Sequence, residues 1–526
     1  MHKVMKGSLC CLLTGLMGMQ SHAQTKPSVL FEAYKKNDQK SILPDFSYVG
    51  YHCGEEAIPD NTNYKVFNVL DFGAKPDDNL SDREAIQAAI TAADRNGSGI
   101  VFFPKGRFLV NEDGDIVKSI VSKGSKIIFR GSGSGPGGTE LFMKNPLQPA
   151  NPQQMWTTPP MFLFSAKGAD AKIGEVSKEA KKGSFDLKIT TTANLNEGDW
   201  IALKLLDNST KLVDEELTPY HADTKWTYLF RKGVDICMYY QVKEISNTGF
   251  ITLHAPLAYS IDTKYKWEVC KFAHSDEVGI ENIAFVGNWK EKFVHHRSWM
   301  DDSGFTLFNF SRCTNSWMKN CRFTDCSVAA IVAQSANVTV VNCIVTGNGG
   351  HEAITSNHST NVLLANLTDE ASQWHSFGVS HGAVNTVLWH CKYPSTTCFE
   401  SHASQPRNTL LDNVTGGLMS NRGGGALENM PNHMNGLVFW NYTQTNEAKK
   451  DFQFWPSDDI WWKIPDPVIA GYKSKGTTFK REQLGYLEAL DEEVTPVSLY
   501  EAQLQLRLKA IPDWFTRWNK LNNNNK

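Results

Sequence analysis

The sequence lacks the features that mark two common classes of protein. After residue 24, no apolar run approaches the roughly 18 residues that a membrane-spanning helix needs. Neither sign of charge dominates, because 53 basic residues stand against 56 acidic ones, and no basic patch of the nucleic-acid-binding kind is present. We therefore predict no membrane span and no nucleic-acid partner.

The sequence also lacks an even set of cysteines. Of 11 cysteines, two fall within the first 24 residues, and the nine that remain cannot all pair with one another. Cys321, Cys343 and Cys391 occupy one equivalent position of the repeat described below. We interpret these three as buried thiols that pack like small apolar side chains. A disulfide elsewhere, for example between Cys313 and Cys326, stays open.

The first 23 residues are typical of a cleaved signal peptide. Lys3 and Lys6 form a basic start, residues 9–19 form an apolar run too short to span a bilayer, and residues 21–23 form a small-residue cleavage site. The mature chain would begin at Gln24. We predict a secreted or periplasmic protein.

A repeat of 22 to 24 residues organises the centre of the chain. Its copies begin at Asn315, Asn337, Asn361, Asn385 and Asn408. The first, third and sixth positions after each start are mostly apolar, and the positions between them are mixed, which is the alternation of a strand. One short strand cannot bury its apolar face alone, so the copies must stack, with equivalent strands paired about 4.8 Å apart. The repeat predicts a parallel β-helix.

A second asparagine stands at the fifth position of most copies. Stacked at one corner of the helix, each side-chain amide could bond to the next, and asparagine tolerates the left-handed backbone that a sharp corner needs. His390 interrupts this predicted ladder. The ladder residues are Asn282, Asn320, Asn342, Asn366, Asn413 and Asn441.

Two N-terminal segments make the pattern more specific. Residues 67–78 read FNVLDFGAKPDD and residues 99–110 read GIVFFPKGRFLV. With the repeats, they resemble the right-handed parallel β-helix proteins of the pectate lyase and polygalacturonase superfamily. The resemblance covers roughly residues 65–445, and it implies an exported, polysaccharide-degrading enzyme that acts on an acidic polysaccharide.

The predicted fold class is all-β, a right-handed parallel β-helix solenoid with an N-terminal capping helix and a C-terminal helical extension. A capping box at residues 81–84 would begin the first helix, and a second at residues 498–501 would begin the last. We expect a monomer. The predicted divisions are a signal peptide at 1–23, a lead-in at 24–64, the β-helix at 65–445 with insertions at about 165–270 and 288–303, and a covering segment with a helix at 446–526.

Histidines and carboxylates gather in consecutive rungs of the predicted β-helix. Positions fourteen and fifteen after the repeat starts hold His351 and Glu352, and two rungs later Glu400, where an earlier rung has Ala329 and Ala330. Each residue taken singly is explained equally well as a solvated turn residue or a satisfied buried histidine. Together they favour catalysis, because equal rung positions lie above one another. The candidate catalytic residues are His351, Glu352, His375, Glu400, His402, Arg407 and Arg422.

The second insertion, residues 288–303, is too polar to belong to the core and is expected to rise beside the strands as the wall of a substrate groove. The candidate substrate-binding residues are His296, Arg297 and Trp299 in this insertion and His381 and His433 in turns near the catalytic cluster. We predict no metal ligands, and we leave calcium open as a cofactor.

Two reactions fit such a groove. A polysaccharide lyase removes the proton beside a uronic carboxylate, so it needs a neutralising group, a base and an acid. Arg407 or Arg422 would neutralise the carboxylate, His402 would be the base and His375 the acid. Strand parity is ambiguous here, since Glu400 and His402 face outward together only if the residues preceding each of them face inward.

A glycoside hydrolase would instead need two carboxylates. Glu352 and Glu400 lie two rungs apart, roughly 9.6 Å by the strand spacing, at the upper limit for an inverting enzyme. The short aspartate motifs of the polygalacturonase branch do not occur as an intact set, and the aspartate cluster of calcium-dependent pectate lyases is not evident. We therefore favour a less common lyase, then a hydrolase, and then a non-catalytic carbohydrate-binding β-helix.

Overall fold

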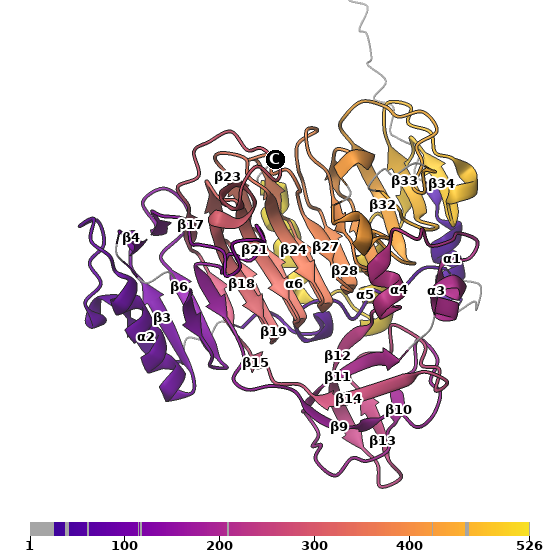
Figure 1. Ribbon diagram of the computed structural model, residues 1–526, viewed down its shortest axis with the longest axis horizontal. Coiled ribbons are helices and arrows are strands. Elements are labelled where there is room, and N and C mark those ends of the chain that lie inside the picture. Colours follow the sequence, from indigo (N-terminus) through magenta and orange to yellow (C-terminus); the bar gives the residue numbers. More distant parts are fainter. Residues whose placement is uncertain are drawn as a thin grey trace, which may run out of the picture.

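The computed structural model in Figure 1 describes residues 26–36, 42–59, 63–113, 115, 118–207, 210–422, 424–457 and 462–524. The predicted signal peptide lies outside these residues. Most of the described chain winds through three parallel sheets that stack rung upon rung, from β2 and β3 at one end to β33 and β34 at the other. The chain is therefore a parallel β-helix, as its repeat predicts.

The fourteen-strand sheet is the longest face of the solenoid. It contains β2 (Val66–Asn68), β3 (Gly99–Phe103), β6 (Ile127–Gly131), β15 (Ser275–Asp276), β16 (Gly279–Glu281), β19 (Cys313–Lys319), β22 (Ala336–Val341), β25 (Thr360–Ala365), β28 (Val384–Trp389), β30 (Arg407–Asp412), β31 (Thr415–Gly416), β32 (Leu437–Gln444), β33 (Val468–Lys473) and β34 (Tyr486–Leu490).

The other two faces are shorter. A six-strand sheet contains β4 (Gly106–Asn111), β7 (Thr139–Met143), β17 (Ala284–Val286), β20 (Arg322–Thr324), β23 (Ile344–Thr346) and β26 (Thr368–Asp369). The seven-strand sheet, which carries the candidate site, contains β5 (Ile120–Ser122), β8 (Phe162–Phe164), β18 (Thr306–Ser311), β21 (Val328–Ala333), β24 (Glu352–Asn357), β27 (Gly378–Ser380) and β29 (Glu400–His402).

The predicted asparagine ladder is confirmed from Asn282 to Asn366. It is wrong at Asn413 and Asn441, whose side-chain amides donate instead to Asp412 and to the backbone carbonyls of Val494 and Val497. Asn320 donates to Asn282 at 3.1 Å, and Asn342 donates to Asn320 at 3.3 Å, all three with positive φ. A second ladder, which the sequence reasoning missed, links the asparagines at the repeat starts themselves. Its bonds run from Asn337 to Asn315, from Asn361 to Asn337, from Asn385 to Asn361 and from Asn408 to Asn385, at 3.0 to 3.3 Å.

The interior of the solenoid is a continuous column of apolar side chains contributed by all three sheets. Cys321, Cys343 and Cys391 are buried in this column as free thiols, which confirms their interpretation as packing residues. Cys313 and Cys326 are also free and buried, so they do not form the disulfide that the sequence left open.

The first insertion folds as a separate antiparallel sheet, which Figure 1 shows as a lobe below the solenoid. The hydrophobic core of this lobe is distinct from the column of the solenoid and also includes Val384, Met430 and Met434 from the solenoid side. Its elements are β9 (Ala171–Glu175), β10 (Asp186–Lys188), β11 (Trp200–Asp207), α3 (Thr210–Leu217), α4 (Thr227–Lys232), β12 (Cys237–Ile245), β13 (Phe250–Leu253) and β14 (Lys266–Lys271).

Helix α2 (Arg83–Asn96) packs its apolar face, Ile86 to Ala93, against the first strands. The predicted capping box at its start is wrong. The N-cap residue is Asp82, and its carboxylate instead accepts hydrogen bonds from the backbone N–H groups of Lys75 and Leu109. These bonds tie the preceding turn to β4.

The outer face of the fourteen-strand sheet is covered by segments from both ends of the chain. The predicted C-terminal cap is confirmed, since Ser498 accepts from the backbone N–H of Glu501. None of the helices described is both long and apolar enough to cross a membrane. The covering elements and short turns are β1 (Lys26–Pro27), α1 (Val29–Lys35), β35 (Val494–Thr495), α5 (Leu499–Leu508), α6 (Asp513–Asn524), η1 (Tyr51–Gly54), η2 (Val69–Phe72), η3 (Met300–Gly304), η4 (Ser420–Arg422), η5 (Leu427–Asn429) and η6 (Arg481–Gln483).

Candidate functional site

The register of the seven-strand sheet decides which side chains face outward. Glu400 pairs with Gly378, and His402 pairs with Ser380. Phe399 lies in the apolar column, and the Ser401 hydroxyl donates inward to the carbonyl of Asn432. Because side chains alternate along a strand, Glu400 and His402 project together from the outer face. The parity that the sequence left ambiguous is thereby settled.

Glu400 and His402 form a hydrogen-bonded pair, with 2.6 Å between Nδ1 of His402 and Oε1 of Glu400. Glu400 is fully buried, whereas a third of the His402 side chain is exposed. Burial alone would lower the pKa of His402, but the charge of Glu400 and the hydrogen bond raise it above its usual value. The pair is thus a histidine oriented by a carboxylate, with its other nitrogen, Nε2, left over for a ligand.

Two glycines make room for this pair. A Cβ atom on Gly424 would lie 2.1 Å from Oε1 of Glu400 and 2.8 Å from Nδ1 of His402. Gly378, in the rung below, would bring a Cβ atom within 3.0 Å of the Cβ of Glu400. The loop after η4 therefore crosses the carboxylate at backbone distance, which only a glycine permits.

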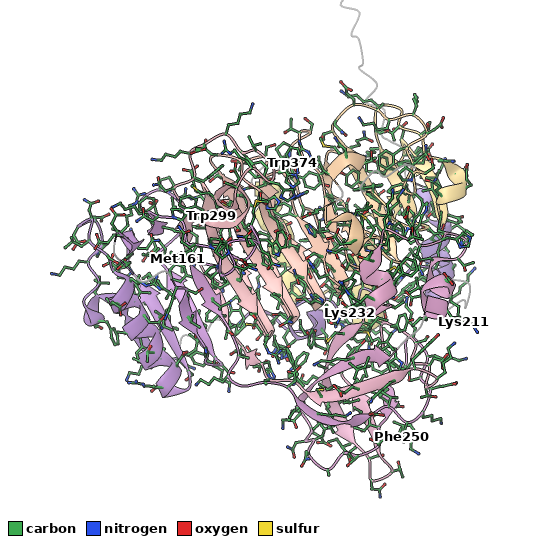
Figure 2. All side chains as sticks on the ribbon, viewed as in Figure 1. Met161, Lys211, Lys232, Phe250, Trp299 and Trp374 are labelled. Atoms are coloured by element: carbon green, nitrogen blue, oxygen red, sulfur yellow. The ribbon has the colours of Figure 1, made fainter. Side chains whose placement is uncertain are left out.

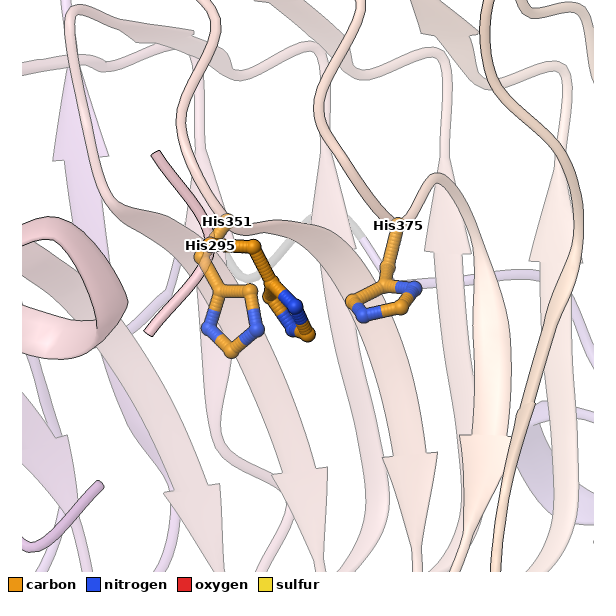
Figure 3. A group of neighbouring side chains, drawn as sticks. All are labelled: His295, His351 and His375. Atoms are coloured by element: carbon orange, nitrogen blue, oxygen red, sulfur yellow. The ribbon is translucent and has the colours of Figure 1, made fainter. Parts of the chain in front are cut away.

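Three imidazoles meet beside the pair, as Figure 3 shows. One nitrogen from each of His295, His351 and His375 lies within 4.8 Å of the other two. His375 is 2% exposed, and its Nδ1 lies 3.4 Å from the same Glu400 oxygen that binds His402. Burial, together with neighbouring positive groups, holds the pKa of His375 well below its usual value.

The rungs and the second insertion bring these rings together. The backbone N–H of His375 donates to the carbonyl of His351, so the two lie in successive rungs. His351 places its Nδ1 2.9 Å from the carbonyl oxygen of Asp302 in the insertion. His295 reaches the group from the same insertion, and burial and the adjacent His296 lower its pKa to about 4.

Buried aspartates fold the insertion back on itself. Asp302 accepts from Nδ1 of His296 at 2.6 Å, and Asp301 accepts two bonds from Arg297 at 2.8 and 2.9 Å. Both predicted substrate-binding residues, His296 and Arg297, are therefore paired within the loop itself. Trp299 comes immediately before η3 and is half-buried.

Trp374 is a site residue that the sequence reasoning missed. Its ring stacks on His295, with 5.1 Å between centroids, and the guanidinium of Arg422 lies 3.8 Å above its centroid. Arg422 also donates to the carbonyls of Trp374 and Thr396. The sequence carried one indication of this role, because Trp374 directly precedes the candidate residue His375. Trp374 and Trp299 are both labelled in the upper half of Figure 2, far from Phe250 of the lobe.

Glu352 and His381 complete the candidate face. Glu352 pairs with His375 across a single bridge, and its carboxylate accepts a hydrogen bond from the Thr355 hydroxyl. Burial and then the charge of Glu400 raise the pKa of Glu352. The ring of His381 stacks on His402 with 5.8 Å between centroids. The structure thus gathers His351, Glu352, His375, His381, Glu400, His402 and Arg422.

Two candidate residues do not join this group. Arg407 begins β30 in the fourteen-strand sheet, where it pairs with Glu216 at 3.1 Å and lies over the ring of Tyr259. It lines a cavity of about 380 Å³ between the solenoid and the lobe. His433 is fully buried and bonded to Thr409 and to the carbonyl of Met434, which makes it a satisfied interior histidine.

Three family models match segments of the chain. Residues 66–182 match a model described as rhamnogalacturonase A/epimerase, pectate lyase-like, and residues 270–417 match one described as right handed beta helix region. Residues 372–518 match a domain of unknown function, DUF4955. The resemblance to pectate-lyase-like, right-handed parallel β-helix proteins is therefore confirmed. Only the first of these three descriptions names carbohydrate-active enzymes, and none of them fixes a reaction for this chain.

Curated relatives match only short pieces. Alginate lyase 7 of Azotobacter vinelandii is 39% identical over 69 residues, which are 13% of this chain and 8% of that protein. Mannuronan C5-epimerase AlgE3 of the same organism is 52% identical over 50 residues, 10% of this chain and 3% of that protein. The matches thus span less than a tenth of either relative.

Solved structures with a similar fold cover most of the chain at low identity. The tailspike protein gp49 from Pseudomonas phage LKA1 is 13% identical, covers 78% of this chain and 72% of its own, and has a TM-score of 0.47. The hyperthermoactive exopolygalacturonase from Thermotoga maritima is 13% identical, covers 84% and 92%, and has a TM-score of 0.31.

Proposed function

We propose that this protein is an exported polysaccharide lyase that cleaves a uronic-acid-containing polysaccharide by β-elimination. The observation that carries the proposal is the pair formed by Glu400 and His402 on the outer face of the seven-strand sheet. A histidine that is one-third exposed and is oriented by a buried carboxylate is suited to remove a proton from a bound substrate.

His402 is the proposed base. Its Nδ1 carries a proton that it donates to Glu400, so Nε2 keeps the lone pair. Nε2 takes the proton beside the uronic carboxylate, the electrons of that C–H bond form a carbon–carbon double bond, and the bond to the glycosidic oxygen breaks. Glu400 stabilises the imidazolium while the proton is held.

Arg422 is the proposed partner of the substrate carboxylate. Its cation lies above the ring of Trp374 at the edge of the histidine group. Neutralising the carboxylate stabilises the charge that develops when the adjacent proton leaves. Arg407 takes no part in binding the substrate carboxylate. It lies on the fourteen-strand sheet, where it is paired with Glu216.

Glu352 replaces His375 as the proposed acid. His375 is almost fully buried beside His295 and His351, so it cannot reach a glycosidic oxygen in the groove. Glu352 lies one rung from His375 and two from Glu400, and it is half-buried on the same sheet. It would give its proton to the leaving oxygen.

The relatives support the substrate class. The names of the two Azotobacter proteins refer to alginate and to C5 of mannuronan. Both lyase chemistry and epimerisation at C5 begin by removing the proton beside a uronic carboxylate. Alginate is therefore the first polysaccharide to test, followed by polygalacturonate.

A glycoside hydrolase is the second candidate, because Glu352 and Glu400 lie two rungs apart on one sheet and Oε2 of Glu400 has no hydrogen-bond partner among the described residues. The test is to incubate the purified protein with each polysaccharide and to follow ultraviolet absorbance from unsaturated ends together with new reducing ends. The proposal expects both signals to rise. Reducing ends without unsaturated ends would replace the lyase by the hydrolase.

A further inference from the structure

We propose that His295, His351 and His375 form a binding site for a divalent transition metal ion of the zinc class. The three nitrogens already lie within 4.8 Å of one another, and Figure 3 shows the rings gathered above successive strands of the seven-strand sheet. A tetrahedral zinc site with bonds of 2.0 to 2.1 Å would need nitrogens about 3.3 Å apart. Small side-chain rotations would bring the rings to that distance.

His351 is held in the tautomer that a metal requires. Its Nδ1 lies 2.9 Å from the backbone carbonyl of Asp302, and a carbonyl can only accept a hydrogen bond. The proton is therefore on Nδ1, and Nε2 presents its lone pair. Nε2 is buried without a hydrogen-bond partner among the described residues. An imidazole fixed by a carbonyl in this way is typical of metal ligands.

His375 supplies a second unsatisfied ligand. It is 2% exposed, and neither ring nitrogen has a hydrogen-bond partner within the part of the chain that the structure describes. Leaving buried polar atoms unpaired is costly, and a bound cation would remove that cost. Glu400, 3.4 Å from Nδ1, would complete the carboxylate–histidine–metal arrangement.

His295 closes the site from the second insertion. Its ring stacks on Trp374, while Asp302 anchors the neighbouring His296. The carbonyl of Asp302 thus contacts His351 in the rungs, and its carboxylate holds His296 within the loop. The loop would bring the third ligand to two that the rungs already hold.

The donor set decides the class of ion. Calcium and magnesium prefer oxygen ligands, whereas imidazole suits zinc, copper, iron and nickel. Three imidazoles with a fourth position open are the ligand set of one type of catalytic zinc site. That position could accept a substrate oxygen; this last step rests on the proposed function, but metal binding itself does not.

The test uses the full mature chain without a histidine tag, freed of metal by a chelator. Zinc is titrated by calorimetry, and cobalt is added separately so that its visible absorbance reports the ligand geometry. We expect one ion per chain. His295→Ala should weaken binding about 100-fold or more. His351→Ala should do the same. His358→Ala, in a turn beside the same sheet and outside the trio, should bind like the unchanged protein.

His295 is the decisive position because it lies on a loop, so its replacement should leave the thermal melting temperature unchanged even if His375→Ala unfolds the protein. The absence of saturable binding, or binding that both His295→Ala and His351→Ala retain, would overturn the site. These titrations contain no substrate. A failure of the lyase proposal therefore leaves their result intact. A protein that shows no saturable zinc binding but still produces unsaturated ends would reject the metal site and leave the lyase proposal standing.

Discussion

The asparagine ladders and the histidine face use the same stacking of rungs in opposite ways. In the ladders, each side-chain amide donates to the amide of the rung before it, as between Asn361 and Asn337. On the seven-strand sheet, Nε2 of His351, both nitrogens of His375 and Oε2 of Glu400 are buried and have no hydrogen-bond partner among the residues that the structure describes. Buried polar groups are rarely left unpaired. We infer from this contrast that folding alone satisfies the polar groups of the ladders, whereas a ligand satisfies those of the histidine face.

The largest expected effect separates chemistry from folding. His402→Ala should lower the rate of elimination by about 10² to 10⁴, the usual contribution of a positioned base. Because the change also removes the partner of the buried Glu400, some thermal stability should be lost, so the rate is compared per folded protein. Activity is measured by unsaturated ends. His221→Ala, at an exposed histidine of the lobe, is the control that should keep full activity. An equal loss of activity in His402→Ala and His221→Ala would contradict the assignment of His402 as the base.

A change in the loop above Glu400 should disturb the site through packing. Gly424→Ala places a Cβ atom 2.1 Å from Oε1 of Glu400, and overpacking of this kind costs about 1 to 3 kcal/mol. We expect lower stability in urea unfolding together with a large loss of activity.

Gly137→Ala is its matched control. Gly137 has the same φ of +74° as Gly424, but a Cβ atom there meets nothing within 4 Å. If the two variants lose equal stability, backbone strain and not the contact with Glu400 explains the effect.

A variant of the asparagine ladder should lose stability but keep its activity. Asn361→Gly keeps the left-handed backbone accessible while it removes the bonds to Asn337 and Asn385. Loss of these hydrogen bonds should lower the free energy of unfolding by about 1 to 3 kcal/mol. The specific activity of the folded fraction should not change. A selective loss of activity would mean that the two regions are not separate.

The smallest expected effect concerns the rim. Trp374→Leu removes the surface under Arg422, and a cation–π contact contributes about 0.5 to 2 kcal/mol. We expect KM for the polysaccharide to rise several-fold with kcat nearly unchanged. A fall in kcat at constant KM would place Trp374 closer to the reacting atoms than we propose.

The repeat predicted what depends on rung stacking. It gave the solenoid, the fifth-position ladder from Asn282 to Asn366 and the buried thiols of Cys321 and Cys343, because each is fixed by one position in each rung. The start-position ladder carried the same signal in the repeated asparagine and was overlooked. Arg407 also carried a signal, since it directly precedes a repeat start and so belongs to the fourteen-strand sheet.

Loops were harder to place from the sequence. The second insertion was predicted to form a wall, but the repeat does not determine its path. His296 and Arg297 pair with buried aspartates of the same loop, whereas His295 reaches the sheet. The stack of Trp374 between His295 and Arg422 likewise joins three segments that no sequence period connects.

The most direct test of the central claim is the mass of the oligosaccharides that the protein releases from alginate or polygalacturonate. Elimination by His402 produces fragments that are one water lighter at their new non-reducing ends, and His402→Ala should produce almost none. The account would be contradicted if the fragments carried the full mass of added water and if the unchanged protein and His402→Ala formed them at equal rates.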